Sequence, residues 1–365
     1  MRLVSPLLKH AIYPALHHSG WLNRMTLPAG FAVVNYHGVV PAEHLSSDAP
    51  SDAPGQDSFL DANLIRPEEF RRQVRFLKDR YHVIHPEDFR AWAEQGKALP
   101  ARAILLTCDD GLLNTLTEML PILQSESVSC LFFVTSASCR ESTGMLWYEE
   151  FYRLMRSKKL TDEDLQLPAG GPASFAAADS FQARWWSTVQ RASRMDASAR
   201  ADWLDRLRSR SGPVSDLRFE KRWRLLNVAE LRKLAAAGMD IGAHTRSHPI
   251  LSLCSDEEAR REIGESKSEL ERALGRPVWA FAYPFGNPST MSERELRLAG
   301  EAGFSSAFLN VEHWSVGGEK AVQPGPQAPN RFAVPRIHVT VNTTLPEFAA
   351  HLSGLHTRLQ LAVGN

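Results

Sequence analysis

The stretch Ala103–Gly111 reads AILLTCDDG. A short, mostly apolar run leads into two adjacent carboxylates, Asp109 and Asp110, and then into a glycine. Such a run is typical of a strand buried on both faces of a parallel sheet. Neighbouring carboxylates repel each other, so burying both requires a cation or a proton between them. Because Asp-Gly is also a common turn dipeptide, this stretch alone fits a turn equally well.

Five further apolar runs resemble the first. They are Phe31–Tyr36, Ser129–Val134, Met239–Ala243, Val278–Tyr283 and Ser305–Leu309. Segments with apolar residues at helical spacing lie between them, at 67–80, 112–124, 227–238 and 257–274. Asn227 and Glu230 have the spacing of a capping box at the start of one of these helices. This alternation predicts an α/β fold in which a parallel sheet is covered by helices and closes, or nearly closes, into a barrel.

The chain also divides by composition. We expect an N-terminal extension at 1–30, a barrel at 31–345 with a helical insertion at about 141–226, and a C-terminal helix at 346–365. Residues 41–62 are rich in Ser, Asp, Ala and Pro and predict a surface loop. The part of the insertion from Arg184 to Arg224 carries eleven Lys or Arg against five Asp or Glu, and four tryptophans. It is expected either to border a substrate site or to be a solvated helical unit whose tryptophans pack inward.

The overall charge and the cysteines narrow the class of protein. Lys plus Arg equals Asp plus Glu, 42 against 42, so no nucleic-acid partner is indicated. The four cysteines lack CxxC spacing, which fits a reducing compartment. No apolar stretch approaches the roughly 18 residues of a membrane span, and residues 1–30 lack a clear signal peptide. A cytoplasmic location is expected, and a peripheral membrane contact by residues 1–25 stays open.

A second polar motif, His244-Thr245-Arg246-Ser247-His248, directly follows the apolar run at 239–243. Two imidazoles four residues apart can converge on one metal ion, although a lone pair of this kind is often incidental. In parallel α/β folds the carboxyl ends of the strands share one rim, which would bring these histidines to Asp110. One Asp and two His form a facial metal triad with open coordination positions, a set suited to metal-assisted hydrolysis.

Two more strand ends carry candidate residues. The stretch AFAYPFG at 280–286 offers aromatic rings for a sugar, including Tyr283, and a backbone N–H at Phe285 for an oxyanion. The stretch NYHGV at 35–39 places His37 at a strand end, where a histidine that is not a metal ligand can act as a general acid. Taken singly, each also fits a core strand with a turn, or a satisfied buried histidine.

Together these motifs resemble the polysaccharide deacetylases, the carbohydrate esterases typified by nodulation-factor, chitin and peptidoglycan deacetylases. The resemblance covers roughly residues 30–150 and 225–340. It implies a distorted (β/α) barrel of about seven parallel strands. It also implies Asp109 as general base and Asp110, His244 and His248 as ligands of one divalent metal. Zinc is the usual ion, and cobalt, nickel, manganese or iron fit the same triad. The amide of Phe285 would help to hold the oxyanion.

The sequence departs from the family pattern in three places. Cys108 stands where Phe is usual. Ala282 stands where an arginine usually braces the catalytic aspartate, and Arg336 is the candidate replacement. The usual C-terminal Leu-x-His motif is not evident, and Leu355-His356 fits it poorly. A permuted subgroup that resembles the poly-N-acetylglucosamine deacetylases takes its acid from an N-terminal Tyr-His pair. Tyr36-His37 fits that arrangement, with His338 as the reserve acid.

The expected activity is metal-dependent hydrolysis of N-acetyl groups from an amino-sugar polysaccharide or oligosaccharide. One alternative is deacetylation or deformylation of a lipid-linked amino sugar at the inner membrane face, which a basic insertion and a basic N-terminus would suit. A second alternative is a catalytically silent carbohydrate-binding barrel. The missing arginine and terminal histidine favour that reading, whereas the complete Asp-Asp and His-His sets oppose it.

Overall fold

The structure is a computed structural model that describes residues 7–22, 27, 30–44, 61–139, 144–157, 160–161, 163–167, 180–211, 221–312 and 330–363. Its strands are β1 (Phe31–Tyr36), β2 (Gly38–Val39), β3 (Leu64–Ile65), β4 (His82–Val83), β5 (Ala103–Cys108), β6 (Leu131–Val134), β7 (Asp240–Ala243), β8 (Ala280–Ala282), β9 (Ser306–Phe308) and β10 (Ile337–His338). Its α-helices are α1 (Tyr13–His18), α2 (Pro67–Arg80), α3 (Pro86–Gln95), α4 (Leu120–Ser125), α5 (Trp147–Arg156), α6 (Phe181–Ala192), α7 (Ala197–Ser211), α9 (Val228–Ala236), α10 (Asp256–Leu274), α11 (Glu293–Glu301), α12 (Leu345–Leu352) and α13 (Leu355–Val363).

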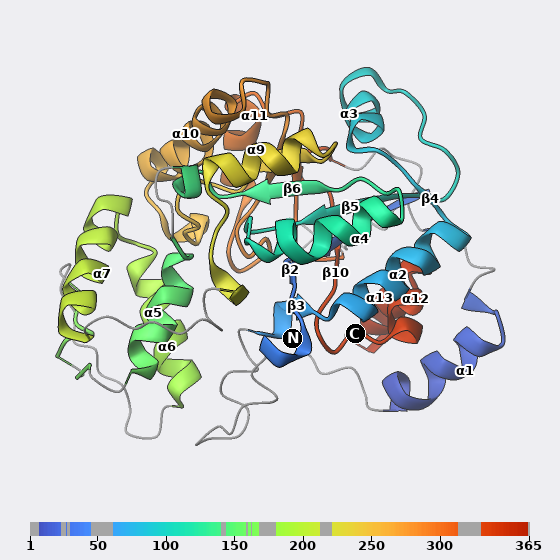
Figure 1. Ribbon diagram of the computed structural model, residues 1–365, viewed down its shortest axis with the longest axis horizontal. Helices are drawn as coiled ribbons and strands as arrows, with labels where there is room; N and C mark the ends of the chain where they lie inside the picture. The colour runs from blue at the N-terminus through green and yellow to red at the C-terminus, as the bar shows by residue number, and fades with distance from the viewer. Residues whose placement is uncertain are drawn as a thin grey trace.

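The main sheet is parallel and runs in the order β10-β1-β5-β6-β7-β8-β9, with β4 pairing the start of β5. All six predicted apolar runs form strands of this sheet, and β1 and β5 have the predicted bounds. Every residue of β5 is buried. Helices cover the outside of the sheet (Figure 1), as is typical of parallel sheets. The predicted α/β barrel-like class, with seven strands along the main path, is therefore confirmed.

One segment near the C-terminus links the two ends of the sheet. Val334 forms a parallel bridge with Phe308 of β9, and three residues later Ile337 pairs with Val34 of β1. The sheet therefore curls round until this segment spans its first and last strands. The closing segment, residues 334–338, also carries Arg336, whose side chain points to the carboxyl end of β5.

The insertion has its own apolar cluster. Its helices α5, α6 and α7 stand together at one side of the sheet (Figure 1). Trp185, Trp203 and Trp223 are almost completely buried in this cluster, so most of the tryptophans pack inward. The boundaries expected for the insertion remain a prediction, since residues 140–143 and 212–220 lie outside the described part of the chain. The expected surface loop at 41–62 lies mostly outside it as well.

Local sequence signals set the helix that precedes β7. Asn227 accepts a hydrogen bond from the Glu230 amide, and Glu230 accepts one from the Asn227 amide, each at 2.9 Å. The predicted capping box is thus confirmed. It fixes where α9 starts and, through the turn at Gly238, where the chain enters β7. Among the described residues, no helix is both long and apolar enough to cross a membrane.

Candidate active site

Asp109 and Asp110 follow β5 directly, at the rim where the parallel strands end. The Asp109 amide donates to the Tyr36 carbonyl at 2.9 Å, which continues the β1–β5 pairing past the strand. Asp110 and Gly111 both have positive φ, 74° and 75°. A Cβ built on Gly111 would lie 2.7 Å from a methyl of Val134, so only glycine fits here without displacement. The Asp-Asp-Gly stretch is therefore a tight turn, and that turn presents the two carboxylates on the rim.

Asp110 lies between the two histidines of the second motif. Its Oδ1 is 3.5 Å from His244 Nε2 and 3.4 Å from His248 Nε2. All three side chains are buried, and they form one of the groups of potential metal donors among the described residues. Burial raises the pKa of Asp110, but contacts with the two imidazoles outweigh it and hold the pKa well below its usual range. An ionised carboxylate thus faces two ring nitrogens.

Other groups fix the orientation of the His244 imidazole and the position of the His248 backbone. His244 Nδ1 lies 2.7 Å from the Ala282 carbonyl oxygen, so Nε2 is the nitrogen directed at Asp110. The His248 amide donates to Thr245 Oγ1 at 2.9 Å. A carbonyl partner on one ring nitrogen is the usual way in which proteins orient a metal-binding histidine.

Glu262 of α10 holds the loop between the two histidines. Its Oε2 accepts from the amides of Arg246 and Ser247 at 2.8 and 2.9 Å, and its Oε1 accepts from the Ser247 hydroxyl. The carboxylate is fully buried. These bonds compensate for an unusual backbone, because Thr245 and His248 have φ of 64° and 57°.

Strained backbone gathers at this rim. Six non-glycine residues of the described chain have positive φ, and four of them are Asp110, Thr245, His248 and Phe285. Each such residue costs on the order of 1–3 kcal/mol and persists only where surrounding contacts hold it. Their concentration at one place makes this rim, rather than another part of the sheet, the candidate site.

The guanidinium of Arg336, in the closing segment, binds the Asp109 carboxylate. Arg336 donates to Asp109 Oδ1 at 2.7 Å and to Oδ2 at 2.6 Å, and the side-chain amide of Asn35 donates to Oδ2 at 3.0 Å. Burial raises the pKa of Asp109, but the Arg336 guanidinium and the nearby imidazoles outweigh burial and leave the pKa below its ordinary value. Arg336 thus occupies the bracing position for which Ala282 has no side chain.

His37 and His338 come to the same rim from neighbouring strands. Their ring centroids are 4.9 Å apart, and interactions with Asp109 and Asp110 act on the pKa of both. Burial, as the largest cause, lowers the pKa of His37 and lowers that of His338 to about 3. Both imidazoles are therefore neutral in the resting site at pH 7. Both candidates for the general acid are at the site, and proximity alone does not choose between them.

Tyr283 and Phe285 have different environments. Tyr283 is fully buried, and its hydroxyl donates to the Phe332 carbonyl at 2.9 Å. The expectation that its ring faces a sugar is wrong, because the side chain points into the core behind the rim. Phe285 has φ of 60° and packs 5.0 Å from the His248 ring. Within the described residues its N–H has no partner, as an oxyanion donor requires.

The insertion contributes to the wall of the candidate site, and a border with a substrate site was one of the two expectations for its basic part. The Tyr148 ring lies 5.1 Å from the His248 ring and 5.6 Å from that of Phe285. Trp147 Nε1 donates to the His248 carbonyl at 3.0 Å. Trp186, from the basic segment, lies 5.5 Å from Phe285. This aromatic wall, Trp147, Tyr148, Trp186 and Phe285, places the insertion beside the candidate ligands.

The basic residues of the insertion are less available than their number suggests. Arg208 pairs with Glu150 and Asp205, and Arg200 is buried beside Glu262.

The sequence did not indicate Asn35 and Glu262 as residues of the candidate site. The available signal for Asn35 was a polar residue inside an otherwise apolar strand, next to Tyr36-His37.

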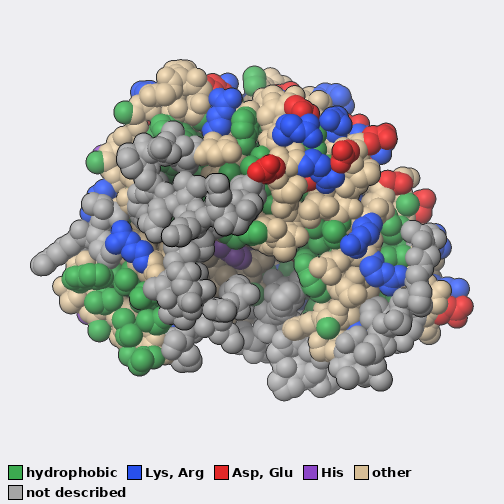
Figure 2. Space-filling view, turned by 180° about the vertical axis from the view of Figure 1, so that it is seen from behind, with side chains coloured by type: hydrophobic (Ala, Val, Ile, Leu, Met, Phe, Trp, Pro, Cys, Tyr) green, Lys and Arg blue, Asp and Glu red, His purple; other side chains and the backbone are tan. Residues whose placement is uncertain are grey.

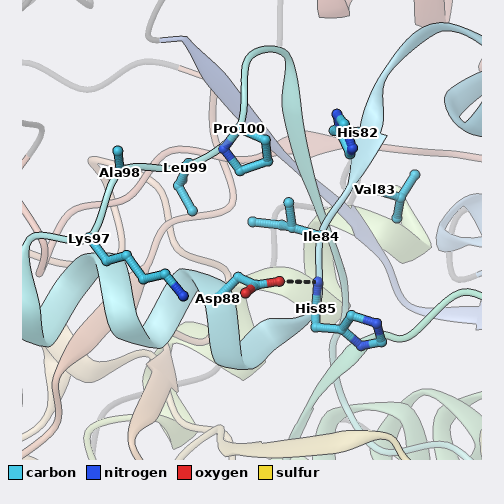
Figure 3. Close-up of a pocket in the computed structure, with 9 residues that line it drawn as sticks. All are labelled: His82, Val83, Ile84, His85, Asp88, Lys97, Ala98, Leu99 and Pro100. Carbon is cyan, nitrogen blue, oxygen red and sulfur yellow. Dashed lines mark hydrogen bonds between the residues drawn. The ribbon is translucent and has the colours of Figure 1, made fainter.

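A hollow elsewhere on the molecule does not compete for this role. A cavity of about 340 Å³ lies between β4 and residues 97–100, and it includes His85, Asp88 and Lys97 (Figure 3). It adjoins the amino end of β5, since His82 pairs with Ala103. The rim that carries Asp109 is at the other end of that strand. In the cavity, the Asp88 carboxylate accepts from the His85 amide and caps α3.

Comparison with known proteins agrees with this location. Residues 215–306 match the family model described as polysaccharide deacetylase, a span that includes His244, His248 and Phe285. Over this span the chain is similar to polysaccharide deacetylases. The predicted resemblance to this family is thereby confirmed over residues 215–306, and the predicted class, a hydrolytic deacetylase, agrees with it.

Solved structures show that the fold extends beyond the matched span. The deacetylase PplD of Streptococcus pyogenes, solved in complex with acetate, is 15% identical, with 89% of this chain and 99% of that chain covered and a TM-score of 0.53. IcaB from Ammonifex degensii is 16% identical over 89% and 97%, with a TM-score of 0.51. A de-N-acetylase from Aggregatibacter actinomycetemcomitans is 14% identical over 88% and 99%, with a TM-score of 0.51. At these identities the likeness concerns the fold of the deacetylase domain.

Proposed function

We propose that this chain hydrolyses N-acetyl groups of an amino-sugar polymer or oligomer, with Asp109 as base and Asp110, His244 and His248 as ligands of one divalent metal. The observation that carries the proposal is that two adjacent buried carboxylates have chemically different partners. Asp110 faces two imidazoles, whereas Asp109 is held by a guanidinium. The first environment suits a metal ligand, and the second keeps a neighbouring carboxylate ionised and oriented.

The donor set fits a metal. One carboxylate oxygen and two imidazole nitrogens lie within 4.8 Å of one another, and all three side chains are buried. Zinc is the ion that this set favours, and cobalt, nickel, manganese and iron use the same ligands. A divalent ion held here would supply a Lewis acid that polarises the amide carbonyl and makes water more acidic.

The chain's own residues account for the remaining chemistry. Asp109, ionised because of Arg336, accepts the proton of the attacking water. The Phe285 N–H donates to the oxygen that gains charge as the carbonyl becomes tetrahedral. His37, neutral in the resting site, first has to gain the proton that Asp109 took from water, and it then delivers that proton to the sugar amine as the C–N bond breaks. Water supplies one proton to the amine and its hydroxyl group to the acyl carbon, so the cycle balances to free amine and acetic acid.

Acetate release tests this function directly. The zinc-loaded chain, incubated with chitooligosaccharides and with poly-N-acetylglucosamine, should release acetate and free amines in equal amounts. Chelation should abolish the release and zinc should restore it. The Asp109→Asn variant is the matched control, since it keeps the ligands and removes the base. A fully metal-loaded chain that releases no acetate from any N-acetylated glycan would instead be a carbohydrate-binding barrel.

A lipid-linked amino sugar is the second candidate substrate, and a surface feature favours it. Leu7, Ile12 and Trp21 are exposed at and near α1, and residues 1–30 contain no acidic residue. Figure 2 shows hydrophobic side chains gathered on the side where Figure 1 places α1. An exposed apolar surface of this kind suits a peripheral contact with a membrane. Deacetylation or deformylation of a polyprenyl-linked amino sugar in anionic vesicles, at a higher rate than for the free oligosaccharide, would select this substrate.

A further inference from the structure

A second group of metal-type donors lies outside the candidate active site. Glu312 follows β9, His351 belongs to α12 and His356 to α13, and one donor atom of each lies within 4.8 Å of the others. The group shares no residue with Asp110, His244 and His248. The sequence motifs did not indicate Glu312 or His351, and they included His356 only in the poorly matching Leu355-His356 pair.

The turn between α12 and α13 brings the two histidines together. Gly354 has φ of 71°, and Ser353 Oγ accepts from the Leu355 amide at 3.3 Å, so α13 starts immediately after α12 ends. As a result the His351 and His356 rings lie with their centroids 3.9 Å apart and an angle of 37° between their planes. Two imidazolium cations this close would repel each other, so the arrangement disfavours protonation of both rings and suits a single divalent cation shared by them.

The carboxylate completes the set. Glu312 forms an ion pair with His351 Nδ1, and its other oxygen accepts from the Thr357 hydroxyl at 2.7 Å. Tyr13, from α1, has its hydroxyl 2.9 Å from His356 Nδ1. Partners that orient the ligands in this way typically surround metal sites. The exposure is low, with 17% of the Glu312 side chain and 11% of the His351 side chain accessible.

Lys9 of the N-terminal helix has partners outside this group. It pairs with Glu347 at 3.0 Å and donates to the Asn342 carbonyl. The carboxylate of Glu312 therefore has the two imidazoles as its partners. We propose that Glu312, His351 and His356 form a second divalent-metal site, of the zinc class, that is separate from the catalytic one. Two His and one carboxylate are a common zinc set with a fourth position left for water.

The position of this site gives it a structural role. Glu312 is two residues after Asn310, whose side-chain oxygen accepts from Asn35, and Asn35 in turn donates to Asp109. The Arg336 amide donates to the Val311 carbonyl at 2.9 Å. A metal ion at Glu312 would tie this loop to α12, α13 and, through Tyr13, to α1. It would thereby fix the loop that contains Asn310 and Val311, which bind Asn35 and the closing segment.

Metal stoichiometry tests the proposal independently of catalysis. The chelated chain is saturated with zinc, freed of excess ion and analysed for bound metal. Wild type should hold two equivalents, Glu312→Gln and His351→Gln should each hold one, and Asp110→Asn should hold one. The double variant Glu312→Gln/Asp110→Asn should hold none. Glu347→Gln, which alters a neighbouring carboxylate of α12 outside the group, should still hold two.

Thermal unfolding provides the second readout. Zinc should raise the Tm of Asp110→Asn, and this rise should be lost when Glu312→Gln is added, with circular dichroism confirming that each variant is folded. A single equivalent in wild type that disappears with Asp110→Asn would overturn the second site and leave the proposed function standing. A single equivalent that disappears with Glu312→Gln would support the second site and overturn the catalytic metal.

Discussion

Arg336 and Asp109 are 227 positions apart in the sequence, yet they form a two-pronged ion pair in which both side chains are almost fully buried. The guanidinium comes from the segment that links β9 to β1, and the carboxylate comes from the end of β5. The segment that closes the sheet therefore also carries the cation that keeps the candidate base ionised. A planar fork matches a carboxylate in a way that an ammonium group does not.

Replacing Arg336 with lysine should weaken both catalysis and folding. Breaking a buried ion pair typically costs about 3–5 kcal/mol, and lysine recovers only part of this because it lacks the fork. Burial then dominates at Asp109, so the pKa of the base rises from its lowered value. Protonation of the base stops catalysis, so the acid limb of the kcat/KM profile should move to higher pH. Arg331→Lys, at an exposed position, is the control. An unshifted acid limb would separate Arg336 from the base.

The Asp109→Asn variant should bind metal as wild type does and lose about 10²–10⁴-fold in kcat, the usual contribution of a general base. Asp109 lies beside Asp110, but the three proposed ligands are complete without it. Metal analysis and acetate release on the same sample measure the two effects. Near-normal turnover would remove Asp109 from the mechanism, and loss of metal would make it a ligand.

His37 and His338 can be distinguished by the leaving group. Loss of the general acid should slow release of a sugar amine by about 10²-fold or more and should affect a 4-nitrophenyl acetate ester far less, because that leaving group needs no proton. We expect this selective loss for His37→Gln. We expect a smaller, uniform effect for His338→Gln, because burial and the neighbouring His37 lower the pKa of His338 to about 3. The reverse pattern would assign the acid to His338.

Glu262→Gln should weaken metal binding without touching a ligand. The carboxylate holds the amides of Arg246 and Ser247 and so fixes the strained loop that carries His248. Partners of this kind typically change metal affinity by about 10–100-fold. Zinc titration of the chelated protein measures the effect at the catalytic site when the Glu312→Gln background removes the second site. Glu265→Gln is the control, because Glu265 pairs with Arg246 at the surface. Equal affinity in both variants would make Glu262 a folding residue only.

Several features were predictable because they depend on neighbouring residues. Apolar runs are long enough to mark β1 and β5 to the residue, and Asn227 with Glu230 marks the start of α9. The rule that parallel strands end at one rim was enough to bring the side chains of Asp110, His244 and His248 together. In each case the information lies within one strand, one turn or one shared direction of strands.

Other features required the tertiary structure. The strand β10 has only two residues, Ile337 and His338, and no periodicity can show in so short a run. Tyr283 and Phe285 are two residues apart, yet one is enclosed in the core and the other borders the site, because the turn at Pro284 reverses the chain between them. The contact of Tyr148 with His248 depends on how a separate helical cluster packs against the rim.

The sequence by itself determined the strand and helix types, the ligand-type residues and the chemistry that they can perform, since these follow from local pattern and side-chain identity. The tertiary structure alone decided which charge each group faces. Asp109 and Asp110 are adjacent and chemically identical. The closing of the sheet brings Arg336 to Asp109, whereas the order of the strands brings two imidazoles to Asp110. Electrostatic partners lie close in space and far apart in sequence, and that is why their assignment depended on the fold.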